Sequence, residues 1–183
     1  MRRLETDLPD LDDLAQQGRL ILLPAGGGDL TAWTHRLAPL ACPQFYLFDR
    51  EQEPETSVRR SVISQLNQRP DCRAALTQKR CLENYLHPEA IAAACGVWVE
   101  VGHDTSVAAA VAQAHPEWQA IWPTLTRRAC QRRIERTKPQ LNTLAVRHMT
   151  VDLLRERDPV GEVIGWFRQI AHLLTTAEEN RAT

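Results

Sequence analysis

The chain has 183 residues, of which 43% are hydrophobic and 25% are charged, and its formal net charge is −1. This length suits one full hydrophobic core, and the near-zero charge excludes a protein-wide field that would attract a polyanion or a membrane surface. The five cysteines form no CxxC pair, no signal peptide is recognisable, and no apolar run approaches the ~18 residues of a membrane span, which together predict a cytoplasmic protein.

The first part of the chain predicts a strand–helix–strand unit that follows a short acidic helix around residues 8–14. The uninterrupted apolar run at residues 20–25, "LILLPA", is typical of a strand that is covered on both faces. Three glycines at residues 26–28 form the expected turn, and Asp29 is the expected N-cap of the next helix. A second strand, "FYLF", follows at residues 45–48. The strands of such a βαβ unit are parallel, and binding sites gather at their carboxyl ends.

The rest of the chain changes from mixed to helical elements. We expect, in order, a helix at residues 55–68, a short third strand at residues 72–77, a helix at residues 88–94 and a strand or extended segment at residues 97–101. Beyond residue 105 the apolar side chains recur at helical spacing. The clearest apolar face is that of the last helix, with Val163, Phe167, Ile170 and Leu174.

Acidic residues follow the predicted strand at residues 45–48. Asp49 and Glu51 are two positions apart, and residues at this spacing in a strand point to the same side. Two carboxylates in such a place repel each other unless a cation lies between them, and Mg²⁺ prefers hard oxygen ligands. Two interpretations therefore remain: a pair of metal ligands, or solvated acids at the start of a loop.

The segment "KRCLENYL" offers a third carboxylate. Lys79, Arg80 and Glu83 come at helical spacing, so Glu83 is a candidate acid beside a metal and the two cations are candidate phosphate ligands. The alternative is an exposed ion pair between Lys79 and Glu83 at i,i+4 spacing.

A strongly basic segment, "RRACQRRIERTK", covers residues 127–138. Arg128, Arg132 and Arg136 lie four residues apart and would line one side of a helix, with Lys138 close by; we call these three residues the arginine stripe. Such a stripe is what binding of a phosphate backbone requires. A solvated helix face is the alternative interpretation.

Three segments in this order, "LILLPAGGGDLTAW", "FYLFDRE" and "KRCLENYL", resemble the Toprim domain at the C-terminal end of the overcoming-lysogenization-defect (OLD) family of nucleases and related ATP-dependent endonucleases. In that family a glycine turn follows an early strand, a later strand ends in an Asp-x-Asp motif, and an "ENYL"-like element comes further along the chain. The resemblance covers residues 20–175. Its most specific parts are residues 49–51, "DRE", and residues 83–86, "ENYL".

The resemblance implies a phosphodiester cleavage that depends on Mg²⁺ or Mn²⁺. Asp49 and Glu51 would be the metal ligands of the Asp-x-Asp motif, with Glu51 in the place of the usual second Asp. Glu83 would be the catalytic acid near the metal, and the arginine stripe with Lys138 would hold the DNA. Two features of the family have no counterpart here: a Glu-Gly motif before Leu20, and the Walker lysine loop of an ATPase.

The predicted fold is therefore α/β: a Toprim-like parallel sheet flanked by helices at residues 1–104, without the first acidic strand, and a helical C-terminal extension at residues 105–183 packed on that core. Two functions remain open. One is Mg²⁺-dependent cleavage of nucleic-acid phosphodiesters; the other is a catalytically inactive Toprim remnant that binds DNA or assembles beside an ATPase domain or chain. An unrelated α/β binding protein is a third alternative. A homo-oligomer is compatible with all three, and no membrane partner is expected.

Overall fold

The computed structural model describes residues 8–24, 30–40 and 42–182, and the chain divides into two units. The first unit contains Met1–Phe48, Pro54–Leu76 and Glu162–Thr183, and the second contains Asp49–Glu53 and Thr77–Gly161. The predicted helical extension, residues 105–183, thus contributes to both units. The expected mixture of helices with a parallel sheet is confirmed.

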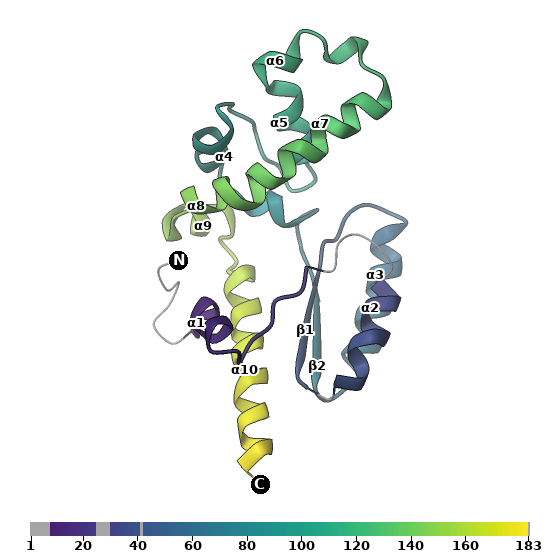
Figure 1. The fold of residues 1–183 in the computed structure, drawn as a ribbon, viewed down its shortest axis with the longest axis vertical. Helices are drawn as coiled ribbons and strands as arrows, with labels where there is room; N and C mark the ends of the chain where they lie inside the picture. The colour runs from purple at the N-terminus through teal and green to yellow at the C-terminus, as the bar shows by residue number, and fades with distance from the viewer. Residues whose placement is uncertain (1–7, 25–29, 41, 183) are drawn as a thin grey trace. The chain divides into compact units, whose positions relative to one another are not determined.

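The first unit contains a small parallel sheet flanked by helices (Figure 1). Its elements are α1 (Leu11–Gln16), α2 (Leu30–Leu37), η1 (Ala38–Leu40), β1 (Gln44–Phe48), α3 (Glu55–Leu66), β2 (Cys72–Leu76) and α10 (Glu162–Ala182). The two strands pair in parallel, with Gln44 opposite Cys72 and Phe48 opposite Leu76. Parallel strands need a crossover, and α3 provides it. α3 also packs against β2, while α10 packs against β1.

The core of this unit lies between the sheet and α3. Phe48, Leu66 and Ala74 are buried together, and each large apolar side chain that is fully buried stabilises the fold by about 1.5–3 kcal/mol. Tyr46 stacks on Phe48 with 6.1 Å between ring centroids, because residues two apart in a strand share a face. The alternation of the strand thus places both rings on one face.

Asn67, directly after α3, forms hydrogen bonds with the backbone in the middle of β2. Its Nδ2 donates to the carbonyl oxygen of Ala74 at 3.1 Å, and the Ala74 N–H donates to its Oδ1 at 2.8 Å. The side chain therefore replaces a neighbouring strand at this position. An exposed strand edge is a template for unwanted pairing, so this side chain protects β2.

The strand predicted at residues 20–25 is wrong over the part that the structure describes. Residues 20–24 form no regular element, and Ile21, Leu22 and Leu23 are 76%, 60% and 53% exposed. The βαβ unit is instead β1–α3–β2, one step later in the chain. An apolar run reports hydrophobicity but does not specify a partner strand, and this run has none within the described residues. The glycine turn and the Asp29 cap lie outside the described residues.

The second unit is predominantly helical. Its elements are η2 (Leu82–Tyr85), α4 (Pro88–Cys95), α5 (Val107–Ala114), α6 (Pro116–Gln119), η3 (Trp122–Thr124), α7 (Arg127–Gln140), the π-helical turn η4 (Leu141–Ala145), α8 (Val146–His148) and α9 (Val151–Arg157). Its core joins α4, α5 and η4 through Ile91, Val107, Val111 and Leu141, each at most 1% exposed. α5 packs on α7 and α4 on η4.

Residues 97–101 are extended but form no strand. Val97, Val99 and Val101 are buried, whereas Trp98 is 58% exposed and Glu100 is exposed as well. This alternation has the period of two that an extended chain gives. The prediction left a strand or an extended segment open, and the second alternative holds. The segment closes the core against α5 without a ladder of backbone hydrogen bonds.

The transition from α7 to η4 has a local cause. Pro139 lies inside α7, where it lacks an N–H and its ring collides with the preceding turn. A π-helical turn follows directly, and the Thr143 hydroxyl donates to the Pro139 carbonyl oxygen at 2.6 Å. Wider turns of this kind are a usual response to such interruptions. The turn places Leu141 and Ala145, both fully buried, in the core.

Candidate functional site

The predicted carboxylates lie in the second unit, where the short segment 49–53 is bound to the loop before η2. The Leu82 N–H donates to Asp49 Oδ1 at 2.9 Å. The Glu51 N–H donates to the Arg80 carbonyl oxygen at 2.7 Å, and Arg80 Nε lies 3.4 Å from Glu51 Oε2. One backbone contact and two side-chain contacts therefore hold the two acids beside "KRCLENYL".

Further polar contacts fix the same segment. The Arg50 N–H donates to Thr77 Oγ1 at 2.8 Å, and this hydroxyl in turn donates to the Lys79 carbonyl oxygen at 2.7 Å. The Arg50 guanidinium forms an ion pair with Asp104. Because Asp104 belongs to the loop after the extended segment, three stretches that are distant in the sequence meet at this point.

The backbone turns sharply at Glu51, so strand alternation does not apply to the acids. β1 ends at Phe48, and Glu51 has a φ of 56°, which is the left-handed conformation. A residue with a Cβ in this conformation costs about 1–2 kcal/mol. Asp49 and Glu51 were expected to point to the same side because they are two residues apart in a strand. They lie outside the strand, so tertiary contacts determine where the two carboxylates point.

The charges of all three predicted acids affect one thiol, that of Cys81. Burial raises the pKa of Cys81 most strongly, and the neighbouring carboxylates of Glu83, Asp49 and Glu51 raise it further. Negative charges disfavour a thiolate, so all three carboxylates act electrostatically on the Cys81 side chain. The contacts of Asp49 with Leu82 and of Glu51 with Arg80 thus place these two acids beside the segment that carries Glu83.

The carboxylates do not form a ready-made cage. Among the side chains that the structure describes, those of residues 8–24, 32–40 and 42–176, no three His, Cys, Asp or Glu lie close enough to hold a metal ion together. The donor chemistry of Asp49 and Glu51 nevertheless fits Mg²⁺, which commonly takes one or two protein carboxylates and completes its shell with water. Arg80 competes with a cation for Glu51 through its 3.4 Å contact.

Asn84 organises this region from the inside, and sequence reasoning assigned it no role beyond the resemblance. It is fully buried, and its Oδ1 accepts from the N–H and the thiol of Cys81 at 3.1 and 2.9 Å. Its Nδ2 donates to the carbonyl oxygens of Gly102 and Thr105 at 2.8 and 2.9 Å. The side chain therefore uses its full hydrogen-bonding capacity to join η2 to the loop that precedes α5.

Lys79 is part of the same interior network. It is 4% exposed, its Nζ donates to the Asn84 carbonyl oxygen at 3.3 Å and to that of Arg157, and it lies 4.6 Å from the centroid of the Tyr85 ring. Arg157 donates to the carbonyl oxygens of Asn84 and Val101, at 2.8 Å each. An ammonium held in this way supports the loop rather than reaching a ligand in solvent.

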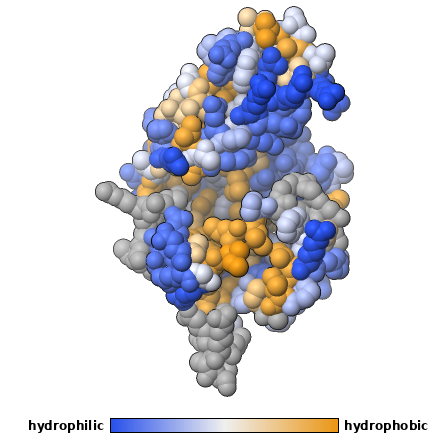
Figure 2. Space-filling view, in the orientation of Figure 1, coloured by the Kyte–Doolittle hydropathy of each residue, from blue (hydrophilic) through white to orange (hydrophobic). Residues whose placement is uncertain are grey.

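The basic segment forms the helix α7, as predicted. The Thr126 hydroxyl caps its start by accepting from the Ala129 N–H at 3.3 Å. The arginine stripe and Lys138 are exposed, and Figure 2 shows strongly hydrophilic residues gathered over this helix. The four-residue spacing of the stripe therefore gives a continuous cationic face.

One part of this face is hollow. Trp118, Arg132, Arg133 and Arg136 line a cavity of about 320 Å³ beside α6. The Arg133 guanidinium lies 5.7 Å from the Trp118 ring centroid, and His115 stacks on the same indole at 4.6 Å. Among the described residues, none of the three arginines forms an ion pair with an acid. The spacing of charges alone does not indicate this hollow, because Trp118 comes from a different helix.

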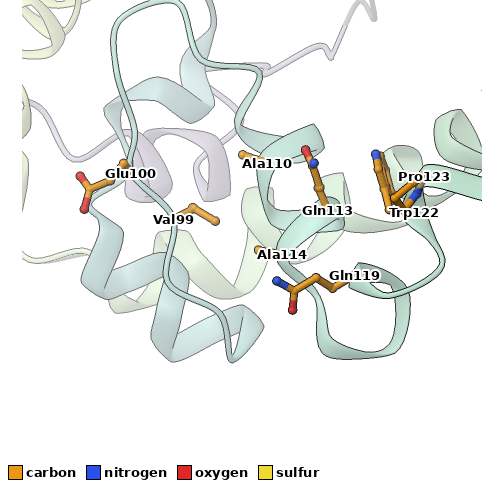
Figure 3. Close-up of a pocket in the computed structure, with 8 residues that line it drawn as sticks. All are labelled: Val99, Glu100, Ala110, Gln113, Ala114, Gln119, Trp122 and Pro123. Atoms are coloured by element: carbon orange, nitrogen blue, oxygen red, sulfur yellow. The ribbon is translucent and has the colours of Figure 1, made fainter.

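A second cavity, of about 370 Å³, lies between the extended segment and α5, α6 and η3 (Figure 3). Its lining residues are Val99, Glu100, Ala110, Gln113, Ala114, Gln119, Trp122 and Pro123. Glu100 is the one charged residue of this lining, and its carboxylate accepts from the Trp98 indole N–H at 3.1 Å. Figure 3 shows this carboxylate pointing away from the other side chains. The cavity therefore presents amides and apolar surface but no metal ligand or nucleophile.

Comparisons with family models, curated proteins and solved structures find no match to this chain. The resemblance to the OLD-family Toprim domain accordingly stays a prediction that rests on the quoted residues. Within the described part of the chain, none of the helices combines the length and the apolar character that crossing a bilayer requires.

Proposed function

We propose that this protein is a nucleic-acid-binding module that holds the phosphate backbone on α7. The observation that carries the proposal is the convergence of Arg132, Arg133 and Arg136 on one hollow with no acidic partner among the described residues. Arginine presents a planar fork of donors that matches phosphate oxygens, and clusters without a counter-ion favour a polyanion. With a net charge of −1, the attraction is local to this face.

Fluorescence anisotropy of a fluorescein-labelled DNA duplex of 20 base pairs, titrated with the protein at several salt concentrations, tests this proposal. Replacing both Arg132 and Arg136 with Gln should weaken binding and make its salt dependence less steep by about 2 in the log–log slope, since each phosphate contact contributes about 0.9. The matched control replaces Arg36 and Arg60, exposed arginines of α2 and α3, with the same loss of charge. Equal weakening by both double variants would refute a specific face.

A second candidate function is cleavage of phosphodiesters with Mg²⁺, and it is favoured by the contacts that hold Asp49 and Glu51 beside the segment that carries Glu83. Asp49 and Glu51 would hold the cation, which when bound supplies Lewis-acid stabilisation of charge on phosphate oxygens. Glu83 would assist from the following turn. Participation of an ATPase partner is a further proposal that rests on the resemblance alone.

Incubation with plasmid DNA and Mg²⁺ or Mn²⁺ tests cleavage. The informative variant is Asp49→Asn, because the amide oxygen can still accept from the Leu82 N–H while the negative charge is lost. Cleavage by the wild type that this variant lacks supports the metal-dependent reaction. If the wild type leaves the plasmid intact with both cations but retards it in a gel, the protein binds without cutting.

A further inference from the structure

The hollow beside α7 differs from an ordinary basic helix face in how its charges are directed. Two members of the arginine stripe, Arg132 and Arg136, line the hollow. Arg133, which does not belong to the stripe, is the third cation of its lining. Arg128 is exposed and does not line it. The five arginines of the helix are therefore of two kinds: Arg127 and Arg128 are exposed outside the hollow, and the other three line it.

The charge of this space favours a ligand with more than one negative charge. Three guanidinium groups around a volume of about 320 Å³ repel one another, and within the described residues no carboxylate forms an ion pair with them. A backbone phosphodiester supplies one negative charge, whereas a phosphomonoester carries about 1.5–2 at pH 7 because its second pKa is near 6. The monoester thus offsets more of the repulsion and can accept several charge-assisted hydrogen bonds.

The walls of the hollow match a nucleotide at the end of a strand. Its volume is at the lower limit of small-molecule sites, which suits one terminal residue rather than a length of duplex. The indole of Trp118 adds an aromatic surface to the cationic one. Arg133 Nε and His115 Nδ1 beside it are buried and make no hydrogen bond in the described structure, so polar groups there remain to be satisfied.

We propose that this hollow binds the terminal phosphomonoester of a nucleic-acid strand. The inference rests on the proposed nucleic-acid binding and gives it a substrate class: strands that end in a phosphate. Arg132 and Arg136 supply the forked donors from successive turns of α7, Arg133 supplies the third charge, and Trp118 forms the wall beside the terminal sugar and base. Arg128 contributes to attraction of the backbone without distinguishing the ends.

The test compares single-stranded 12-mers of one sequence that carry a 5′-phosphate, a 3′-phosphate or two hydroxyl ends. The wild type should bind one phosphorylated strand about tenfold more tightly than the hydroxyl strand, since one extra charge-assisted hydrogen bond is sufficient for such a ratio. Arg136→Gln should reduce this ratio to about one, whereas Arg128→Gln should weaken all three strands equally and preserve the ratio. Lowering the pH from about 7.5 to 5.5 should reduce the ratio, because the second phosphate charge is lost.

The outcomes separate the inference from the function on which it rests. If all three strands bind the wild type equally well, the terminal-phosphate site is refuted while nucleic-acid binding stands. If no strand binds, both are refuted. Competition with AMP and with inorganic phosphate distinguishes the source of the phosphate. If AMP displaces the labelled strand at the same concentration as an unlabelled strand does, the ligand is a free nucleotide and the proposal of a strand end is refuted.

Discussion

Asn84 is the position where a single substitution tests the polar interior most directly. Its side chain is 0% exposed and makes four hydrogen bonds, to the N–H and thiol of Cys81 and to the carbonyl oxygens of Gly102 and Thr105. Asn84→Ala removes these bonds while the backbone groups stay buried. Asn84→Asp keeps the size and the accepting oxygen but replaces the donating NH₂ group with a second oxygen that faces two carbonyl oxygens.

The expected loss follows from the groups left without partners. In Asn84→Ala, one backbone N–H and two carbonyl oxygens lose their hydrogen bonds, and each unsatisfied buried group costs about 1–3 kcal/mol. Taking the lower limit for each, we expect the free energy of unfolding to fall by about 3 kcal/mol. Asn84→Asp should lose more at pH 7, because it also places a negative charge next to the carbonyl oxygens.

The pH dependence of Asn84→Asp provides an independent check. Burial and two facing carbonyl oxygens disfavour the ionised carboxyl, so its pKa in the folded state lies above the unfolded value of about 3.9. The folded state then binds more protons than the unfolded state, and the variant gains stability as the pH falls toward 4. Asn84→Ala introduces no titrating group and should lack this gain relative to the wild type.

Hydrogen exchange read by mass spectrometry, at increasing urea concentration, reports the free energy of unfolding for peptides of each unit. Peptides from β1 and α3 in the first unit serve as the internal control. A loss below about 1 kcal/mol in Asn84→Ala, or a pH profile of Asn84→Asp parallel to that of the wild type, would show that the Asn84 hydrogen bonds do not support the second unit.

Three further predictions concern burial, thiol chemistry and the sheet edge. Ile91→Ala should lower the free energy of unfolding by about 2–5 kcal/mol, because Ile91 is 0% exposed. The control Ile21→Ser, at a position 76% exposed, should change it by less than about 0.5 kcal/mol. Urea denaturation measures both variants, and equal shifts of their midpoints would contradict the burial of Ile91. Cys81 should react with N-ethylmaleimide at pH 8 much more slowly in the native than in the urea-unfolded protein, because burial and nearby carboxylates raise the pKa of its thiol. The native rate should increase as the pH rises. Peptide mass spectrometry measures the rates, and equal rates in native and unfolded protein would refute a buried thiol with a raised pKa. Asn67→Ala should expose the edge of β2 and increase light scattering at high protein concentration, an effect that should be absent if the edge is covered by other means.

The two candidate functions use different elements of the second unit and can be separated by mutation. The arginines belong to α7, and the carboxylates belong to the segment 49–53 and to η2. A variant such as Asp49→Asn should therefore bind nucleic acid as the wild type does, even where it abolishes cleavage. Loss of binding in this variant would indicate that folding of the unit, rather than chemistry, had changed.

The failure at residues 20–24 shows a limit of reading strands from hydrophobicity. The pattern "LILLP" meets every local requirement of a buried strand, yet Ile21, Leu22 and Leu23 are exposed. The strands at residues 44–48 and 72–76, predicted within a residue or so at each end, have no stronger local pattern. What distinguishes them is the crossover α3, whose apolar side packs against both strands' core residues.

Interactions between residues close in the sequence determine where several helices begin. Pro88 begins α4, the Thr126 and Thr150 hydroxyls cap α7 and α9, and the charged spacing of α7 follows directly from residue order. These features depend on neighbours within one or two turns, which the sequence places together by construction.

The tertiary structure alone decided which distant residues meet. It placed Trp118 beside the arginines of α7, buried Lys79 and Asn84, and turned Glu51 into a left-handed conformation next to Arg80. Each of these outcomes depends on loop closure and on the packing of side chains far apart in the chain. Such contacts form where the free energy gained from burial and hydrogen bonding exceeds the free energy lost as conformational entropy on ordering the chain. No pattern of neighbouring residues indicates that difference.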